Sequence, residues 1–312
     1  MNTLPRPLLR ILLAVFFVLA AAADSEAAKQ IGVIMTGNLP YYGEMHDAFV
    51  AEINKKFSGA DKVEFILQRP FPDPISWSNA ARKLIAFDVD LIVSYGSPAT
   101  QATLKEKSSI PIIYAGLYEP EQIVISGKNV TGCGFKVPLS SILRYFKLLK
   151  PVNTLGIVFS NLEEDSVRQY KTMQTLAEQQ NIKTEKIDIR SRTDLDKLKV
   201  GNMDAVFITG SSLAHLWIND IITILEKRKI PAADIFPDNS ESGLLMTLYQ
   251  PSRSQGHMAA EMATQILRGE NLNNINAYTF RDTELVLNLA EARRLGITFP
   301  IRLLIEATKV IR

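Results

Sequence analysis

Short apolar runs rich in Val and Ile alternate along the chain with longer segments whose apolar residues recur every three or four positions. The run 91–95 is typical of a buried strand, because it is short and β-branched and ends at Gly96. Met45, Phe49 and Ile53 follow one another at a spacing of four, so they share one face of a helix. The alternation predicts an α/β fold with parallel sheets covered by helices. We expect strands at 31–35, 63–67, 91–95, 111–115, 130–135, 155–159, 184–189, 204–208, 244–248 and 284–288. We expect helices at 42–57, 76–87, 98–107, 140–149, about 162–180, about 213–228, 253–268, 290–295 and 303–311.

The order strand, helix, strand, helix, strand occurs twice, first before about residue 135 and again after it. Two such halves fit two lobes better than one sheet of ten strands. Polar or glycine-rich loops follow the strands in both halves, and open parallel sheets bind ligands at that edge. If the two sheets face each other, the loops meet in a cleft between the lobes. These loops are 36–40, 96–100 and 116–121 in the first half, and 160–166, 210–212 and 238–243 in the second.

The turn after strand 91–95 is the strongest single candidate for a ligand contact. Ser97 suits the N-cap of a helix, and Pro98 suits its first position. The open N–H groups of that turn, together with the hydroxyls of Ser97 and Thr100, would suit a carboxylate or another anion. The alternative is a capped helix start without a ligand, which every βα turn provides.

The first 23 residues have the pattern of a secretory signal peptide. Arg6 and Arg10 precede an apolar run at 11–23, which ends in small residues before Asp24. The run is shorter than the roughly 20 residues that a membrane anchor needs, and no cysteine near the cleavage site offers a lipid anchor. Removal of this segment lowers the formal charge from +2 to zero, so nothing in the charge favours nucleic acid or an anionic membrane. We therefore expect a periplasmic or secreted protein that is not a lipoprotein.

The residues give little support for catalysis. Cys133 is the one cysteine, which excludes an internal disulfide and a cysteine-based metal site. His46, His215 and His257 have no metal-like spacing, and the chain contains neither a G-x-S-x-G motif nor a P-loop. The acidic trio 163–165 stands at a helix start, where it would serve the helix dipole rather than a metal. We expect no enzyme activity, no metal and no cofactor.

The predicted loops are rich in neutral donors and acceptors. Tyr41, Tyr42, Tyr95, Tyr114 and Tyr118 lie in the loops or beside them. Such a lining suits a small polar molecule with an apolar or aromatic part. Each of these tyrosines could equally pack in the core or at the rim.

Several motifs then occur in a fixed order. They are G-[ST]-P-A-T at 96–100, I-P-I-[IV]-[YF]-A at 110–115, [DE]-P at 119–120, N-V-T-G at 129–132, N-x-x-x-x-S at 161–166, D-A-[VI]-[FY] at 204–207 and an L-x-[IL]-N…L-G-[IL]-x-[FI]-P pattern at 285–300. With them the chain resembles the solute-binding proteins of ABC importers over about residues 29–311. The branch is that of the ABC transporter substrate-binding proteins, whose members include aromatic amino-acid binders.

The resemblance implies a type I periplasmic-binding-protein fold, with two Rossmann-like lobes and a hinge of three crossings near residues 135, 247 and 278. The first lobe would be 29–135 plus 248–278, and the second 136–247 plus 279–312. The ligand contacts that it implies are Ser97 and Thr100 in the first lobe, Asn161 and Ser166 in the second, and more weakly Asp238 and Asn239. From the loops we add Tyr41, Tyr42, Tyr95, Glu119 and Ser211 as candidates.

The chain departs from the family pattern at two places that bear on the ligand. A second-lobe loop that often reads P-x-D-N in relatives is T-G-S-S at 209–212. The first loop has L-P-Y-Y at 39–42 in place of the Gln and His-Pro of some aromatic amino-acid binders. Both departures leave the identity of the ligand open.

The leading hypothesis is an extracytoplasmic solute-binding protein of an ABC importer, which closes on a small polar ligand such as an amino acid. Its partners would be the small-molecule ligand and the permease subunits, with no nucleic acid and no membrane insertion after signal cleavage. We expect a monomer. Two alternatives stay open, which are a periplasmic sensor for a membrane receptor or kinase, and a secreted enzyme with a site between the lobes.

Overall fold

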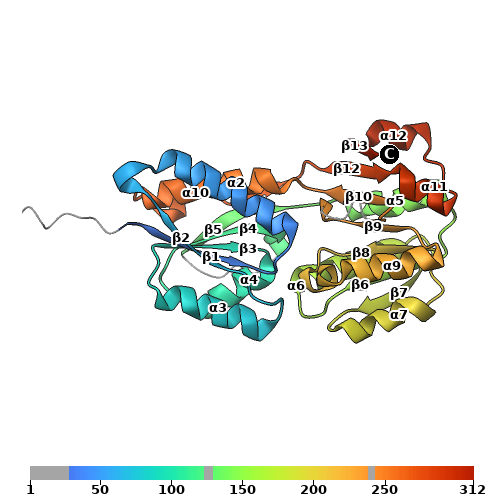
Figure 1. The fold of residues 1–312 in the computed structure, drawn as a ribbon, viewed down its shortest axis with the longest axis horizontal. Helices are drawn as coiled ribbons and strands as arrows, with labels where there is room; N and C mark the ends of the chain where they lie inside the picture. Colours follow the sequence, from blue (N-terminus) through green and yellow to red (C-terminus); the bar gives the residue numbers. More distant parts are fainter. Residues whose placement is uncertain (1–27, 123–128, 238–242) are drawn as a thin grey trace, which may run out of the picture.

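The computed structural model describes residues 28–122, 129–237 and 243–312, which form two units built on separate sheets (Figure 1). All strands of the first sheet that pair with each other run parallel. Its order is β11 (Tyr278–Phe280), β5 (Val130–Phe135), β4 (Ile112–Tyr118), β3 (Leu91–Tyr95), β1 (Gln30–Met35) and β2 (Glu64–Gln68).

Helices cover both faces of the first sheet because the apolar side chains of its strands alternate in direction. Ile31 and Val33 pack in the core beneath α2 (Pro40–Lys56) and α10 (Ser252–Leu267), which lie side by side. Ile34 and Ile92 point the other way, toward α3 (Pro74–Ala86) and α4 (Ser97–Lys105). Figure 1 shows these two helix pairs on opposite sides of the sheet. The parallel α/β class expected from the sequence is confirmed.

The second sheet has seven strands, parallel except for the antiparallel pair β10 and β12. Its order is β13 (Lys309–Ile311), β12 (Glu284–Asn288), β10 (Met246–Tyr249), β9 (Ala232–Asp234), β8 (Ala205–Ile208), β6 (Thr154–Phe159) and β7 (Lys183–Asp188). The helices of this unit are α5 (Leu139–Leu149), α6 (Glu164–Glu178), α7 (Lys197–Val200), α8 (Ser212–Leu216), α9 (Ile218–Arg228), α11 (Leu289–Leu295) and α12 (Ile301–Glu306).

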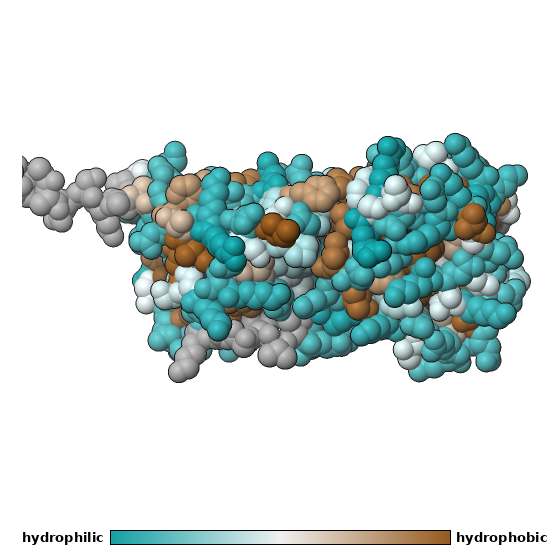
Figure 2. Space-filling view, turned by 90° about the horizontal axis from the view of Figure 1, so that it is seen from below, coloured by the Kyte–Doolittle hydropathy of each residue, from teal (hydrophilic) through white to brown (hydrophobic). Residues whose placement is uncertain are grey.

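Three short segments connect the two units, at 136–138, 250–251 and 281–283. Because the chain crosses three times, the first unit takes its last helix and strand, α10 and β11, from near the carboxyl end. Thr247, which the resemblance placed near a crossing, lies within β10 of the second sheet. Figure 1 shows the two units lying end to end along the long axis of the molecule, and Figure 2 shows that hydrophilic side chains cover most of one face.

Three expected elements differ in the structure. The helix expected at 303–311 ends at Glu306. The Thr308 N–H then donates a hydrogen bond to the Leu285 carbonyl, and β13 begins at the next residue. The β-branched residues of β13 suit a strand. The helix expected to reach 228 is broken at Trp217, which leaves helical geometry between α8 and α9. Part of the loop expected at 116–121 belongs to β4, which continues to Tyr118 after an irregular step in its pairing with β5.

No helix in the described ranges is long and apolar enough to span a bilayer.

Candidate functional site

The two units meet at the carboxyl ends of their parallel strands. Tyr118, at the end of β4, donates its backbone N–H to Asp165 Oδ2 of α6 at 3.2 Å. Its carbonyl accepts a hydrogen bond from Arg168 Nη2 at 2.9 Å. Asp165 and Arg168 also form an ion pair with each other. One turn of α6 thus holds both backbone polar groups of a residue in the other unit.

An aromatic contact lies in the same interface. The Tyr41 ring of α2 stacks on Phe236, with centroids 4.6 Å apart and planes inclined by 20°. Tyr42 approaches Phe236 edge-on at 6.1 Å. All three rings are buried, although Tyr41 and Tyr42 come from one unit and Phe236 from the other. Stacked rings of this kind contribute roughly 0.5–1.5 kcal/mol beyond the apolar area that they bury.

The turn between β3 and α4 is held rigidly from within the first unit. Gly96 has φ +85°, and a Cβ atom there would lie 2.5 Å from the Thr36 and Tyr42 hydroxyl oxygens, so glycine is required. Thr100 donates its hydroxyl to the Gly96 carbonyl at 2.9 Å, and its oxygen lies 2.8 Å from Ser94 Oγ. The Thr100 hydroxyl therefore has two partners inside the turn itself.

Ser97, the first residue of α4, differs from its neighbours. Its side chain is fully buried, and its hydroxyl bonds to no group of its own unit. It lies beside the Asp165 carboxylate of the other unit and lowers the pKa of that group. The larger effect is burial, which raises the pKa of Asp165 to about 6 against the opposing pull of Arg168.

Glu163 serves a helix start, but that of α8 and not its own. Its carboxylate accepts hydrogen bonds from Ser211 Oγ at 2.6 Å, Ser212 N–H at 2.8 Å and Leu213 N–H at 2.9 Å. The side chain is buried, and burial raises its pKa although these donors oppose the shift. The α8 start thus has a fixed acceptor, as a helix amino end requires.

The Tyr42 hydroxyl lies where the polar groups of both units come together. Thr36 of its own unit and Ser212 of the other lie within its reach. Burial raises the pKa of this phenol, and the charges of Glu163 and Asp165 raise it further. Both acids therefore act on one point of the interface.

A hydrogen-bonded chain lies on the side of the crossings. Gln255 of α10 donates to Tyr41 Oη at 2.9 Å and to Gln250 Oε1 at 2.6 Å, and it accepts from the Gly116 N–H at 2.8 Å. His215 is buried close by, with Nδ1 2.8 Å from the Ser211 carbonyl and its ring 4.9 Å from that of Phe236. This histidine therefore has structural partners.

Other predicted contacts have their hydrogen bonds within one unit. The Tyr95 hydroxyl lies 3.4 Å from His46 Nδ1 in the core of the first unit. Ser166 Oγ lies 2.7 Å from Thr209 Oγ1. Glu119 pairs with Lys136 at 2.6 Å beside a crossing. Asn161 is exposed, and its backbone N–H donates to Asp188 at 3.0 Å. Asp238 and Asn239 lie outside the described residues.

The sequence reading missed the acids and Phe236 as parts of the interface. Their one visible signal was position, since 163–165 stands at a predicted helix start after a strand and Phe236 ends a short apolar pair before the loop at 238–243. Contacts such as that of Asp165 with Tyr118 join residues 47 positions apart, so no local sequence pattern predicts them.

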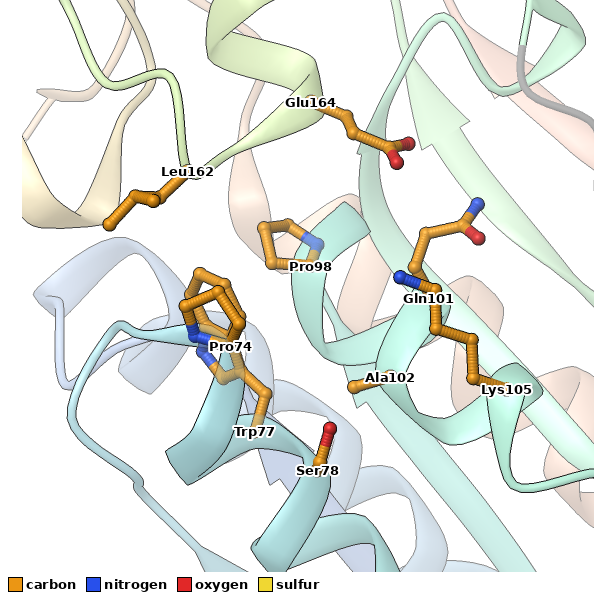
Figure 3. Close-up of a pocket in the computed structure, with 9 residues that line it drawn as sticks. All are labelled: Pro74, Trp77, Ser78, Pro98, Gln101, Ala102, Lys105, Leu162 and Glu164. Atoms are coloured by element: carbon orange, nitrogen blue, oxygen red, sulfur yellow. The ribbon is translucent and has the colours of Figure 1, made fainter.

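A small pocket of about 100 Å³ opens at the outer edge of the interface (Figure 3). Trp77 and Pro98 line it from the first unit, and Leu162 and Glu164 from the second. Among the residues that the structure describes, no three His, Cys, Asp or Glu side chains are grouped to hold a metal ion.

Two sheets joined by three crossings, with buried polar groups between their carboxyl edges, define a two-lobed α/β protein of the periplasmic-binding type. The family model for ABC transporter substrate binding protein matches residues 58–311, and the chain belongs to that family.

Three known proteins are similar to this chain. The chain is 22% identical over 276 residues to a tyrosine-binding protein of Clostridioides difficile. The aligned region covers 85% of this chain and 80% of the relative. A Streptococcus pneumoniae ABC domain solved in complex with L-Trp matches with a TM-score of 0.84 and 23% identity, over 91% of this chain and all of that chain. A conserved domain protein from Vibrio cholerae matches with a TM-score of 0.85 and 21% identity, over 91% and 99% of the two chains. The fold is that of type I periplasmic binding proteins.

Proposed function

We propose that this chain is the extracytoplasmic solute-binding component of an ABC importer, which captures an amino acid between its lobes and is not an enzyme. The lobes would be the two units of the structure, close to the bounds 29–135 plus 248–278 and 136–247 plus 279–312 expected from the sequence, except that Leu248 and Tyr249 pair in the second sheet and Thr279 and Phe280 in the first. The observation that supports it most is the burial of polar side chains from both lobes against each other, with Ser97 beside Asp165 and Tyr42 beside Ser212. A ligand that contacts both faces favours the closed arrangement of the lobes.

The relatives suggest the class of amino acid. One is named for tyrosine and another was solved with L-Trp, so an aromatic amino acid is the first candidate. Tyr41, Tyr42 and Phe236 would offer such a ring aromatic neighbours on both lobes.

The proposed importer role also implies where the protein acts and which proteins it contacts. Residues 1–23 would direct export and be removed, and the mature monomer would deliver its ligand to the permease. The alternative of a sensor shares every feature of the cleft. Neighbouring genes for a permease and an ATPase support the importer, whereas a lone kinase gene supports the sensor.

The test is a thermal-shift screen of the mature chain against the twenty amino acids, followed by small-angle scattering with each hit. A ligand at 100 times its Kd stabilises the folded state by about 2.7 kcal/mol, which gives a measurable rise in Tm. We expect an aromatic amino acid to raise Tm. In scattering, the chain with this ligand should be as compact as the chain alone or more compact. The proposal fails if no amino acid shifts Tm. If the chain hydrolyses a member of a substrate panel, the enzyme hypothesis replaces it.

A further inference from the structure

The short helix α12 presents two isoleucine side chains to solvent. Ile301 is 77% exposed and Ile305 is 78% exposed. They stand four residues apart, so they protrude from one face of the helix, one turn from each other. Leu303, which lies between them in the sequence, is fully buried in the core of the second lobe. The inner face of α12 therefore anchors the helix, and its outer face offers apolar surface to solvent.

Helix α5 lies against α12 and extends this surface. Glu306 of α12 accepts hydrogen bonds from Arg144 Nη2 at 2.8 Å and from the Tyr145 hydroxyl at 3.0 Å. Leu148, one turn after Arg144 on α5, is 42% exposed. Figure 1 shows α12 and β13 next to each other, on the side of the second lobe away from α7. We call the exposed side chains of α5, α12 and β13 the α5–α12 patch.

The α5–α12 patch is strongly basic. Of the 35 basic and 33 acidic side chains of the whole chain, residues 139–150 and 301–312 contain six and one, which leaves 29 basic and 32 acidic elsewhere. The one acid, Glu306, pairs with Arg144 at 2.8 Å and lies 3.6 Å from Arg302. The surplus of positive charge is therefore concentrated on the patch, around the exposed isoleucines.

The elements that border the patch do not cancel its charge. Helix α11 contacts β13 and carries Arg293 and Arg294, and its acid Glu291 is buried in an ion pair with Arg294. Helix α6 packs against α5, and its exposed Glu178 is offset by the exposed Lys171. The patch and its borders thus remain positive as a whole.

A partner for this patch must supply negative charge around an apolar region. A second copy of the chain would bring a patch of the same sign, so like charges would oppose its docking. An anionic bilayer supplies both features, because its surface is negative and the boundary of its acyl chains lies within about 5–10 Å of the headgroups. Aliphatic side chains surrounded by Lys and Arg are typical of proteins that bind at such a surface.

We propose that the α5–α12 patch binds the surface of an anionic membrane, with Ile301 and Ile305 entering the headgroup layer and the surrounding cations contacting lipid phosphates. The formal charge of the whole chain does not reveal such a surface, because acids elsewhere offset it. The contact is peripheral and reversible, and it involves none of the cleft residues. It would hold the protein at the bilayer that contains the proposed permease.

The experiment is flotation of the mature chain with vesicles of phosphatidylcholine, either alone or with about one third phosphatidylglycerol. We expect binding to the anionic vesicles in about 50 mM salt, at least tenfold weaker binding in about 500 mM salt, and little binding to neutral vesicles. Ile301→Ser combined with Ile305→Ser should weaken binding to anionic vesicles at least tenfold. Lys147→Glu combined with Arg302→Glu should do the same, because it reverses two charges of the patch.

Matched controls carry the same changes elsewhere on the surface. Ile75→Ser removes an isoleucine that is 74% exposed on α3 of the first lobe, and it should bind vesicles as the wild type does. Lys62→Glu combined with Lys227→Glu reverses two exposed cations outside the patch and should also bind as the wild type does. The changed side chains of the patch are exposed, so Tm should stay within a few degrees of the wild type in every variant.

Two further probes separate a bilayer from other anions. Inorganic phosphate should release the chain from vesicles no better than sodium chloride of equal ionic strength, and a greater effect would assign the patch to free phosphate and overturn the membrane contact. Binding of polyglutamate without binding of vesicles would assign it to an acidic protein and also overturn the proposal.

The vesicle results decide the rest. No binding to anionic vesicles at low salt, equal binding to neutral ones, or wild-type binding by both patch variants overturns the proposal. Equal losses in the patch variants and in their controls overturn it as well. The amino-acid screen does not involve this patch, so the solute-binding function stands or falls separately.

Discussion

The cross-lobe stack of Tyr41 on Phe236 should help to hold the lobes closed, and its removal makes the sharpest test of that role. The perturbation is Phe236→Leu, which keeps an apolar side chain in the buried site but removes the ring face 4.6 Å from Tyr41. The stacking contribution of roughly 0.5–1.5 kcal/mol is available only when the lobes meet. Its loss should shift the ratio of closed to open molecules by about 2- to 12-fold toward the open form, since 1.4 kcal/mol is a factor of ten.

The assay is a distance measurement between spin labels on the two lobes. Lys105 of α4 and Lys171 of α6 are exposed and can be replaced by cysteine. Cys133, the natural cysteine, is buried, so the labels should attach at the introduced sites. We expect the distribution for Phe236→Leu to gain a longer-distance population, and the apparent Kd for ligand to rise by the same factor.

Phe159→Leu provides the control. Phe159 stacks on Tyr170 with centroids 4.4 Å apart and a 19° inclination, almost the geometry of the cross-lobe pair, but both rings belong to the second lobe. This variant should lower Tm without changing the distance distribution. Equal distributions for Phe236→Leu and the wild type, or equal shifts in both variants, would refute the reasoning.

Three further predictions follow from the cleft and its turns. Gly96→Ala should lower the free energy of unfolding by at least 1–2 kcal/mol in urea titration, because φ +85° strains an L-residue and its Cβ would clash with the Tyr42 hydroxyl; an unchanged midpoint would contradict this. Folding raises the pKa of Asp165 to about 6, so the folded state binds a proton that the unfolded chain lacks between about pH 6 and about pH 4. The free energy of unfolding should therefore rise by up to about 1.4 kcal/mol for each pH unit that the pH falls in this range. Urea titrations at about pH 7 and about pH 5 should show this rise in the wild type and not in Asp165→Asn. Glu163→Gln should cost roughly 1.5–3 kcal/mol of stability by thermal unfolding, because it weakens three charge-assisted hydrogen bonds at the start of α8, whereas the neighbouring exposed Glu164→Gln should cost almost nothing.

The sequence predicted most strands well because their signals are local. The strands at 91–95, 130–135 and 284–288 have the same bounds in the structure, since each is a short apolar run ended by turn residues or a helix start. The segment 309–311 was predicted as helix and is a strand. It is a strand because it pairs with β12, a contact with residues more than 20 positions earlier.

The candidate site also combines features that the local sequence predicts with features that depend on distant contacts. Its expected position at the loops after the strands followed from the α/β pattern, but Ser97, predicted as the N-cap, is the first residue of α4, and Gly96 is the N-cap. The partner that Ser97 faces was not predictable, because Asp165 lies 68 residues further on and in the other lobe. Thr100 was treated like Ser97, yet its hydroxyl is bonded inside the turn, and only the contacts of the folded chain separate the two. Their part in ligand contact stays a prediction.

The discontinuous first unit has a consequence for how the chain reaches its folded state. Helix α2 packs against α10 so closely that a Cβ on Gly256 would lie 2.2 Å from the Met45 carbonyl oxygen. The partner of α2 therefore emerges from the ribosome some 200 residues after α2 itself, and β11 later still. Contacts of such separation slow folding. During synthesis the amino-terminal half would remain without this cover, so its apolar face would stay accessible to chaperones until α10 is made.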